Sequence, residues 1–322
     1  MLSKRSMTAV AVTLVISMSL QSGAAFGSAS PAPSAAKSVP VLTPLSAAAP
    51  AVTSRSGSQA IYNDFLKLVK QPERLQEAAA YVDQHIGEVS QTQAGNMVLR
   101  LENAQKNALN LWVDKMSAPG VQESIAKLYK HGDSFTNVIY RTNDWKLRSL
   151  LKSARDSGYK LETAEGMFFP IIDYKRYEKY RPYVRPSIQQ YIDIMSVESE
   201  AVPYKDAALF IPWEEVISRA LSQEAYLSAH SSSNRAKEVK QLYNQYLITS
   251  FYGLSNTPLF DYDDKRMDQE AREAFEKLLQ EKDTSSSPYL TKLKGFMDVL
   301  KKNDYKLNSE GEQYRKKNAP IN

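Results

Sequence analysis

Apolar residues recur at helical spacing along most of the chain, and this pattern constrains the fold more than any other feature. In segment 71–89, Leu75, Ala79, Val82 and Ile86 are spaced four, three and four residues apart. That spacing places them in one stripe on one helix face. The same pattern recurs in segments 97–116, 121–130, 145–157, 213–229, 236–251, 265–281 and 288–302. We therefore predict an all-α fold, an irregular multi-helix bundle in which the first two segments form an antiparallel pair.

The helical pattern is interrupted between Gly158 and Pro212. Residues 159–162 are compatible with an extended conformation, and prolines at 182, 186 and 203 predict short helices after it. Asn143 or Asp144 before segment 145–157 is a suitable N-cap, and Gly158 after it is a suitable C′ residue. Ser287 is a suitable N-cap for segment 288–302. If residues 59–322 form two helical subdomains, we expect the boundary near Gly158.

The N-terminus has the composition of a secretory signal peptide. Lys4 and Arg5 precede the uncharged apolar run 7–20, and small residues follow. The run is shorter than the roughly 20 residues that a membrane span needs. We expect a signal peptide over residues 1–27, with cleavage near Gly27 or Ala29, and no transmembrane segment in the mature chain. An uncleaved anchor helix is the alternative.

Residues 28–58 are rich in alanine, proline and serine, a composition that predicts a disordered spacer. The spacer would be either a stalk or a protease-tolerant tail. The chain contains no cysteine, which excludes disulfides, thiol nucleophiles and cysteine-based zinc sites. Together, the signal, the spacer and the missing cysteine are typical of envelope proteins of a Gram-positive bacterium, and they predict a secreted or envelope-associated location.

The net charge of +5 is concentrated at the N-terminus. Residues 1–58 contain Lys4, Arg5, Lys37 and Arg55 and no acid. Subtracting these four from 41 basic residues leaves 37 against 36 acidic ones, a net charge of +1. This balance argues against a general nucleic-acid partner.

The centre of the chain is bipolar, with a local net charge of +5 over residues 141–191 and −5 over residues 192–230. Basic and tyrosine residues interleave in the tyrosine-rich segment, residues 174–186. Its candidate binding residues are Tyr174, Arg176, Tyr177, Lys179, Tyr180, Arg181, Tyr183 and Arg185. These side chains could stack on sugars and neutralise an anionic wall polymer. Alternatively, the tyrosines pack in the core while the basic segment pairs with the acidic one, and we favour this second interpretation.

A glycan-cleaving enzyme would need paired carboxylates. The candidates are Glu165, Asp173, Glu198 and Glu214. The sequence Val197-Glu198-Ser199 resembles the catalytic Glu-Ser of the lytic transglycosylases, which are helical enzymes that cut peptidoglycan. The rest of that signature is absent, because residues 207–212 replace the expected Gly-Leu-Met-Gln stretch.

Metal and cofactor motifs are not found in the sequence. The acidic segment 261–268 fails the calcium-loop pattern because Lys265 and Arg266 occupy its fifth and sixth positions. We expect its acids to begin the following helix instead. The three histidines, at positions 85, 131 and 230, form no His-Glu-x-x-His pair. We therefore expect no metal and no cofactor.

These observations predict an extracytoplasmic protein that binds or scaffolds at the cell envelope. The partner would be a wall polymer or an envelope protein, and we expect binding rather than catalysis. The alternative is a peptidoglycan- or glycan-active hydrolase. A cleft lined by two of the candidate carboxylates, away from any cation, would favour the hydrolase. Carboxylates held in ion pairs would favour the binding protein.

Overall fold

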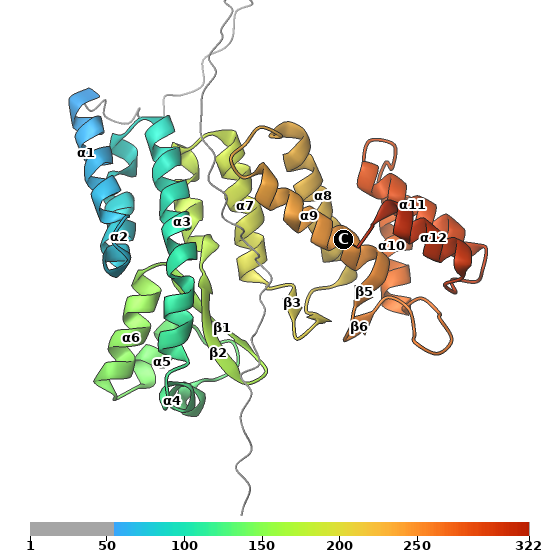
Figure 1. The fold of residues 1–322 in the computed structure, drawn as a ribbon, viewed down its shortest axis with the longest axis horizontal. Coiled ribbons are helices and arrows are strands. Elements are labelled where there is room, and N and C mark those ends of the chain that lie inside the picture. Colours follow the sequence, from blue (N-terminus) through green and yellow to red (C-terminus); the bar gives the residue numbers. More distant parts are fainter. Residues whose placement is uncertain (1–54, 322) are drawn as a thin grey trace, which may run out of the picture. The chain divides into compact units, whose positions relative to one another are not determined.

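A computed structural model of the chain describes residues 55–321 (Figure 1). The expected signal peptide and residues 28–54 of the expected spacer lie outside the described residues. The first helix begins at Arg55. Residues 55–58, which were predicted to belong to the spacer, are therefore part of a helix.

The described chain is predominantly helical, as predicted. The elements before residue 201 are α1 (Arg55–Leu68), η1 (Pro72–Arg74), α2 (Leu75–His85), η2 (Ile86–Glu88), α3 (Gln91–Met116), α4 (Val121–Leu128), α5 (Phe135–Arg141), α6 (Trp145–Asp156), β1 (Tyr159–Ala164), β2 (Met167–Ile172), η3 (Tyr174–Tyr183) and α7 (Pro186–Glu200). The later elements are β3 (Tyr204–Lys205), β4 (Ala208–Leu209), α8 (Trp213–Ala229), α9 (Ala236–Tyr252), β5 (Gly253–Leu254), β6 (Thr257–Pro258), α10 (Gln269–Glu281), α11 (Pro288–Lys301) and α12 (Ser309–Asn318). The strands form three separate antiparallel pairs.

Two hydrophobic cores hold these elements together. The first extends from Phe65 to Ile192 and surrounds α3, which contacts α2, β2 and η3. The second extends from Ile211 to Ala319 and lies among α8, α9, α10 and α11. A small cluster that includes Tyr191 and Tyr226 connects α7 with α8 and α9.

The subdomain boundary expected near Gly158 falls inside the first core. Ala154 and Tyr159, on either side of that glycine, both belong to the first core. The change between cores comes instead between Ile192 and Ile211. Gly158 is the residue that ends α6: its φ is 95°, and a Cβ there would lie 2.0 Å from Gln105 Nε2. The glycine therefore marks a turn within the first core.

Capping residues fix several helix ends. Ser90 and Gln93 form a reciprocal capping box at the start of α3, with Ser90 Oγ accepting from the Gln93 backbone N–H at 3.3 Å. The carboxylate of Asp144 accepts from the Lys146 N–H at 2.8 Å. Ser287 Oγ accepts from the Leu290 N–H at 3.1 Å. The predicted caps at Asp144 and Ser287 are confirmed.

The start of α10 and the length of α7 differ from prediction. Helix α10 begins at Gln269 and not at residue 265, because Asp268 is its N-cap. The preceding acids form a loop in which Asp261 accepts backbone hydrogen bonds from Asp263 and Asp264. Pro186 opens the long helix α7 at its first position, where a missing N–H costs nothing. No helix among residues 55–321 is both long and apolar enough to cross a bilayer.

Candidate functional site

The tyrosine-rich segment folds mainly as the 3-10 helix η3. Tyr174, Tyr177 and Tyr180 recur every third residue, and a 3-10 helix has three residues per turn. All three tyrosines, which we call the tyrosine ladder, therefore lie on one face and pack into the first core. Successive ring centroids are 5.5 and 5.6 Å apart. This strict period of three was the sequence signal that would have predicted the ladder.

The hydroxyl groups of the tyrosine ladder are committed to internal partners. Tyr174 donates to Glu102 Oε1 at 2.7 Å. Tyr177 donates to Gln105, and Tyr180 donates to Asp83. Burial raises the pKa of the Tyr174 and Tyr177 hydroxyls well above the usual value. These three rings are therefore closed to an external ligand.

Tyr183, the fourth tyrosine of the segment, is 37% exposed. It is the one tyrosine of the predicted binding set with a substantial surface in solvent. Its ring lies against Gly87, where a Cβ would approach Cε1 of Tyr183 to 3.2 Å.

The basic side chains of the segment mostly contact neighbouring elements. Lys179 pairs with Asp83 at 2.6 Å. Arg181 pairs with Asp193 at 2.9 Å, which joins the basic segment to the acidic one as the second interpretation expected. Arg185 donates to Thr92 Oγ1 at 2.9 Å. The predicted binding set is thus divided between a core face and a solvated, ion-paired face.

Glu102 forms the centre of a buried charge network that we call the Glu102 network. Its carboxylate is 1% exposed and lies on α3. It accepts from Lys106 Nζ at 2.7 Å, from Arg235 Nε at 2.9 Å and from the hydroxyls of Tyr174 and Tyr191. Arg235, at the start of α9, thereby ties the second half of the chain to α3.

Glu238 completes this network. It lies 3.1 Å from Arg235 Nε and 3.3 Å from Lys106 Nζ, so two acids face two cations. Burial raises the pKa of Glu102, but the charges of Lys106 and Arg235 and the hydrogen bonds more than offset this. The net result is a pKa below the usual glutamate value. The two acids and two cations of the network balance each other, so its net charge is zero. These contacts give the network a structural role.

Glu198, the residue with the transglycosylase resemblance, lies in a second buried network that we call the Glu198 network. Tyr246 donates to its Oε2 at 2.7 Å, and Arg219 Nη1 lies 3.3 Å away. Arg219 also pairs with Glu215 at 3.0 Å, so two acids share one cation. Burial raises the pKa of Glu198, and Tyr246 and Arg219 offset this only in part.

The other candidate carboxylates lie in different surroundings. Glu165 occupies the exposed β1–β2 turn, where a hydrogen bond to Asp206 raises its pKa. Glu214 is exposed in the first turn of α8. Asp173 lines a cavity that contains none of the other three. The structure therefore does not place any two of these four carboxylates on opposite sides of one cleft.

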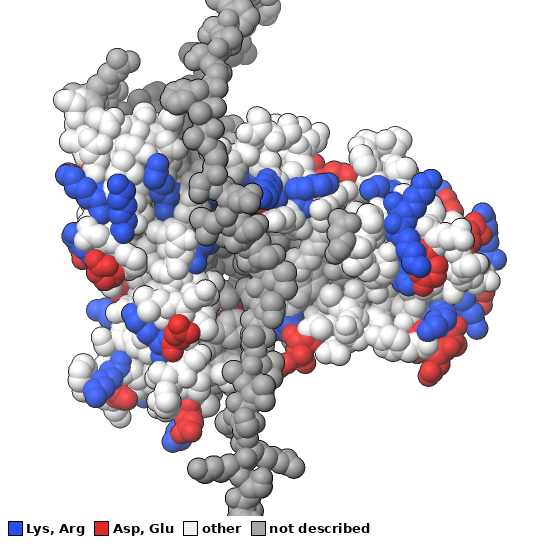
Figure 2. Space-filling view, in the orientation of Figure 1, with Lys and Arg blue, Asp and Glu red and all other residues white. Residues whose placement is uncertain are grey.

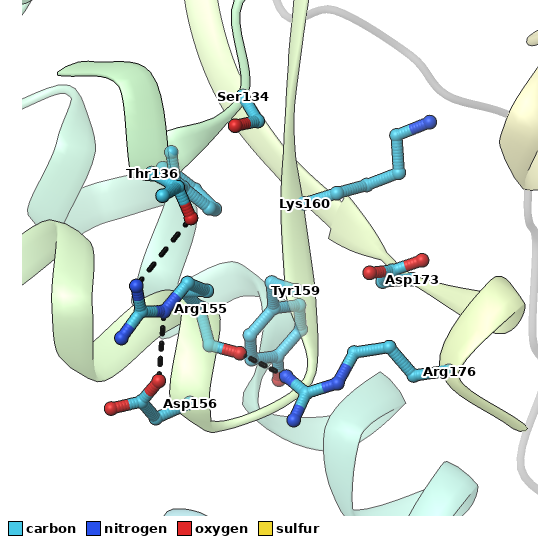
Figure 3. Close-up of a pocket in the computed structure, with 9 residues that line it drawn as sticks. Ser134, Thr136, Arg155, Asp156, Tyr159, Lys160, Asp173 and Arg176 are labelled. Carbon is cyan, nitrogen blue, oxygen red and sulfur yellow. Dashed lines mark hydrogen bonds and ion pairs between the residues drawn. The ribbon is translucent and has the colours of Figure 1, made fainter. Parts of the chain in front are cut away.

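The cavity beside Asp173 has a volume of about 290 Å³ (Figure 3). It is bordered by the start of α5, the end of α6, β1 and the junction of β2 with η3. Its lining residues are Ser134, Phe135, Thr136, Arg155, Asp156, Tyr159, Lys160, Asp173 and Arg176. Three cations and two acids give these residues a net charge of +1. We call this the Arg155–Arg176 cavity.

The two guanidinium groups lie on either side of Tyr159 (Figure 3). Arg155 Nε donates to Asp156 at 2.9 Å, and Arg176 donates to the carbonyl oxygen of Arg155. Lys160 donates to the Ser199 carbonyl at 2.7 Å. Each guanidinium carries five N–H donors, so both retain donors for an additional acceptor. Planar forks of this kind suit carboxylate and phosphate groups.

Burial raises the pKa of Asp173 in the cavity, while the charges of Arg176 and Lys160 oppose the rise. The hydroxyl of Ser134 donates to Asn137 Oδ1 at 2.6 Å and has no histidine beside it among the lining residues. The arrangement is suited to holding an anion and lacks an activated nucleophile.

Sequence reasoning named Asp173 and Arg176 but missed Arg155 and Lys160. These residues meet because β1 pairs with β2 in the register Tyr159↔Ile172, which brings the end of α6 beside Asp173. Recognising the whole β1–β2 hairpin in the sequence would have predicted this meeting, but only β1 was predicted to be extended.

Residues 55–321 contain no group of three or more histidines and acids arranged to hold a metal ion. On the face shown in Figure 2, basic and acidic side chains lie beside one another at several places. In comparisons with protein families, with curated proteins and with solved structures, nothing matches this chain.

Proposed function

We propose that this chain is an exported protein that binds a component of the cell envelope without cleaving it. The Arg155–Arg176 cavity receives an anionic group of that component. The observation that carries the proposal is the pair of guanidinium groups at one cavity with a surplus of positive charge. The signal peptide and spacer expected from residues 1–58 support an extracytoplasmic location.

The carboxylates support binding over hydrolysis. Glu198 is held by Arg219 and Tyr246, and Asp173 faces Arg176 and Lys160. A glycan hydrolase needs two carboxyl groups on opposite sides of the scissile bond, with one kept protonated by an apolar environment. The raised pKa values of Glu198, Asp173 and Glu165 favour the hydrolase, but these carboxyl groups do not line one cleft, and the partners of Glu198 hold it within an internal network.

Retention on purified Gram-positive cell walls tests the proposal. The double variant Arg155→Gln/Arg176→Gln removes both forks from the cavity. A matched control, Lys175→Gln/Arg181→Gln, removes the same charge from η3 outside the cavity. We expect the first variant to lose retention and the second to keep it. Equal retention of all three proteins would reject the cavity as the binding site.

Zymography on the same samples tests the hydrolase. Clearing of a peptidoglycan gel by the purified protein that disappears in Glu198→Gln would replace the binding proposal with catalysis. A pull-down against envelope proteins distinguishes the second class of partner, because a protein partner would be captured from extracts that contain no wall polymer.

A further inference from the structure

Two large aromatic side chains project into solvent beside the turn between α5 and α6. Tyr140 is 83% exposed and Trp145 is 71% exposed. The other two tryptophans of the chain, Trp112 and Trp213, are buried in the two cores. An exposed tryptophan and an exposed tyrosine forgo the burial that normally stabilises such residues. Core packing therefore does not account for this pair.

Exposed cations follow the aromatic pair along α6. Lys146, Arg148 and Lys152 are all exposed, and no acid lies between Trp145 and Arg155. Lys146 Nζ lies 5.8 Å from the centroid of the Trp145 ring. In the part of the chain that the structure describes, neither Lys146 nor Lys152 forms an ion pair. Lys146 and Arg148 oppose the helix dipole because they lie in the first turn, so helix stability does not explain them.

This surface is continuous with the Arg155–Arg176 cavity. Thr136 lines the cavity, and Tyr140 lies one turn later on α5. Arg155 lines the cavity as well, and Lys152 lies one turn earlier on α6. Helices α5 and α6 pack against each other (Figure 1). At a rise of about 1.5 Å per residue, Trp145 and Arg155 are about 15 Å apart along α6, long enough for an extended polymer.

We propose that the α5–α6 surface, formed by Tyr140, Trp145, Lys146, Arg148 and Lys152, binds an anionic polysaccharide. The apolar faces of sugar rings pack on Trp145 and Tyr140, while phosphate or carboxylate groups pair with the cations. The proposal rests on the proposed function and identifies its ligand class. The polymer lies along α6 with one anionic group in the cavity.

The composition of this surface favours a polysaccharide over a membrane. The apolar residues Leu147, Leu151 and Ala154 of α6 face the first core. A helix that enters a bilayer interface needs a free apolar face, which α6 does not have. The net charge of +1 for residues 59–322 likewise argues against a nucleic acid, whose binding depends on a large excess of cations.

Trp145 provides a direct measurement, because it is the exposed tryptophan among the three. The purified protein is titrated with a soluble phosphate-bearing wall polysaccharide, a carboxylate-bearing one and neutral dextran. Quenching by acrylamide, which is uncharged, reports access to the indole ring. We expect both charged polymers to reduce quenching and dextran to leave it unchanged. The two charged arms distinguish phosphate from carboxylate as the preferred group.

Variants then test the contacts. We expect Tyr140→Ala/Trp145→Ala to weaken binding, measured by calorimetry, about tenfold. The matched control is Phe210→Ala, since Phe210 is 60% exposed and has Lys205 Nζ 5.3 Å from its ring centroid. This control should bind like the unchanged protein. Lys146→Gln/Lys152→Gln should reduce the salt dependence of binding.

Unchanged affinity of the Tyr140/Trp145 variant overturns the inference, as does equal shielding of Trp145 by oligonucleotides or anionic vesicles. The wall-retention assay separates this inference from the proposed function. If the cavity variant loses retention and the Tyr140/Trp145 variant keeps it, only the α5–α6 surface is rejected. If the unchanged protein is not retained on walls, the proposed function fails, and the titration with soluble polymers still decides on the surface.

Discussion

Glu102 is fully buried and the Glu198 side chain is 10% exposed, and their surroundings shift their pKa values in opposite directions. Glu102 has two cations and one further acid around it, so the cluster is neutral. Glu198 shares Arg219 with Glu215, which leaves one negative charge in excess. The pKa of Glu102 is lowered and that of Glu198 is raised. The count of nearby cations, and not burial alone, decides which charge state the fold prefers.

The two networks also differ in whether every buried polar atom has a hydrogen-bond partner. Every hydrogen-bonding atom of the Glu102 side chain has a partner. In the Glu198 network, Gln223 Nε2 donates to Glu198 at 3.2 Å, but Gln223 Oε1 is buried without a partner. The first network is expected to fix the fold rigidly, and the second is expected to tolerate change.

The largest expected effect is the loss of Arg235. Arg235→Met leaves Glu102 and Glu238 with Lys106 alone, and it should lower the free energy of unfolding by about 3–5 kcal/mol. Arg219→Met should cost less, about 1–3 kcal/mol, because Glu198 already tends toward its neutral form. Urea denaturation of both variants provides the comparison. An equal loss in the two would show that the networks do not differ in this way.

Neutralising each glutamate gives the next largest contrast. Glu102→Gln should destabilise the chain by about 3 kcal/mol, because two buried cations would then face one acid. Glu198→Gln should change the free energy of unfolding by less than about 1 kcal/mol, since burial already disfavours its charge. The fluorescence of Trp112 in the first core and Trp213 in the second follows unfolding of each core. A larger loss for Glu198→Gln would reverse the assignment.

Removing one hydroxyl from the Glu102 network is a milder change. Tyr174→Phe deletes a hydrogen bond to a charged group and should cost about 1.5–3 kcal/mol. Tyr183→Phe, in the exposed last turn of η3, is the matched control and should stay within about 0.5 kcal/mol. Thermal unfolding followed by circular dichroism measures both. Similar melting temperatures for the two variants would mean that the tyrosine ladder hydroxyls add nothing.

The smallest expected difference is in pH dependence. The stabilisation from Glu102 is complete above the unfolded pKa, near 4.5, and is lost as pH falls through the lowered folded pKa. Glu198 has the opposite sign, so acidification through its raised folded pKa toward 4.5 should stabilise the chain relative to Glu198→Gln. Urea titrations from pH 7 down to well below 4.5 measure the two trends. Parallel curves for both variants would contradict the opposite shifts.

Local sequence patterns predicted much of the fold. The apolar periodicity predicted α8 over residues 213–229, and the structure has Trp213–Ala229. It missed α12, a polar helix in which only Gly311 is buried, because such a helix has no apolar stripe to detect. It also missed η3, since a 3-10 helix repeats every 3.0 residues and not every 3.6.

The candidate site was less predictable because its residues meet through long-range contacts. Arg235 and Glu102 are 133 residues apart in the chain, and no local pattern encodes their pairing. The interpretation of the tyrosines as core residues is confirmed for Tyr174, Tyr177 and Tyr180. The exposure of Trp145 was not predicted, because a first-turn aromatic next to an apolar stripe looks like a core residue.

The period of three in η3 has a consequence for how this segment can change length. Deleting one residue within residues 174–183 would rotate every later position by about 120° and move the following tyrosines away from Gln105 and Asp83. Deleting three residues would remove one full turn, so the later tyrosines would keep their orientation and only one tyrosine of the ladder would be lost. We therefore expect naturally occurring insertions and deletions in this segment to come in multiples of three residues, a rule that would identify the tyrosine ladder in a distant sequence even where little else is similar.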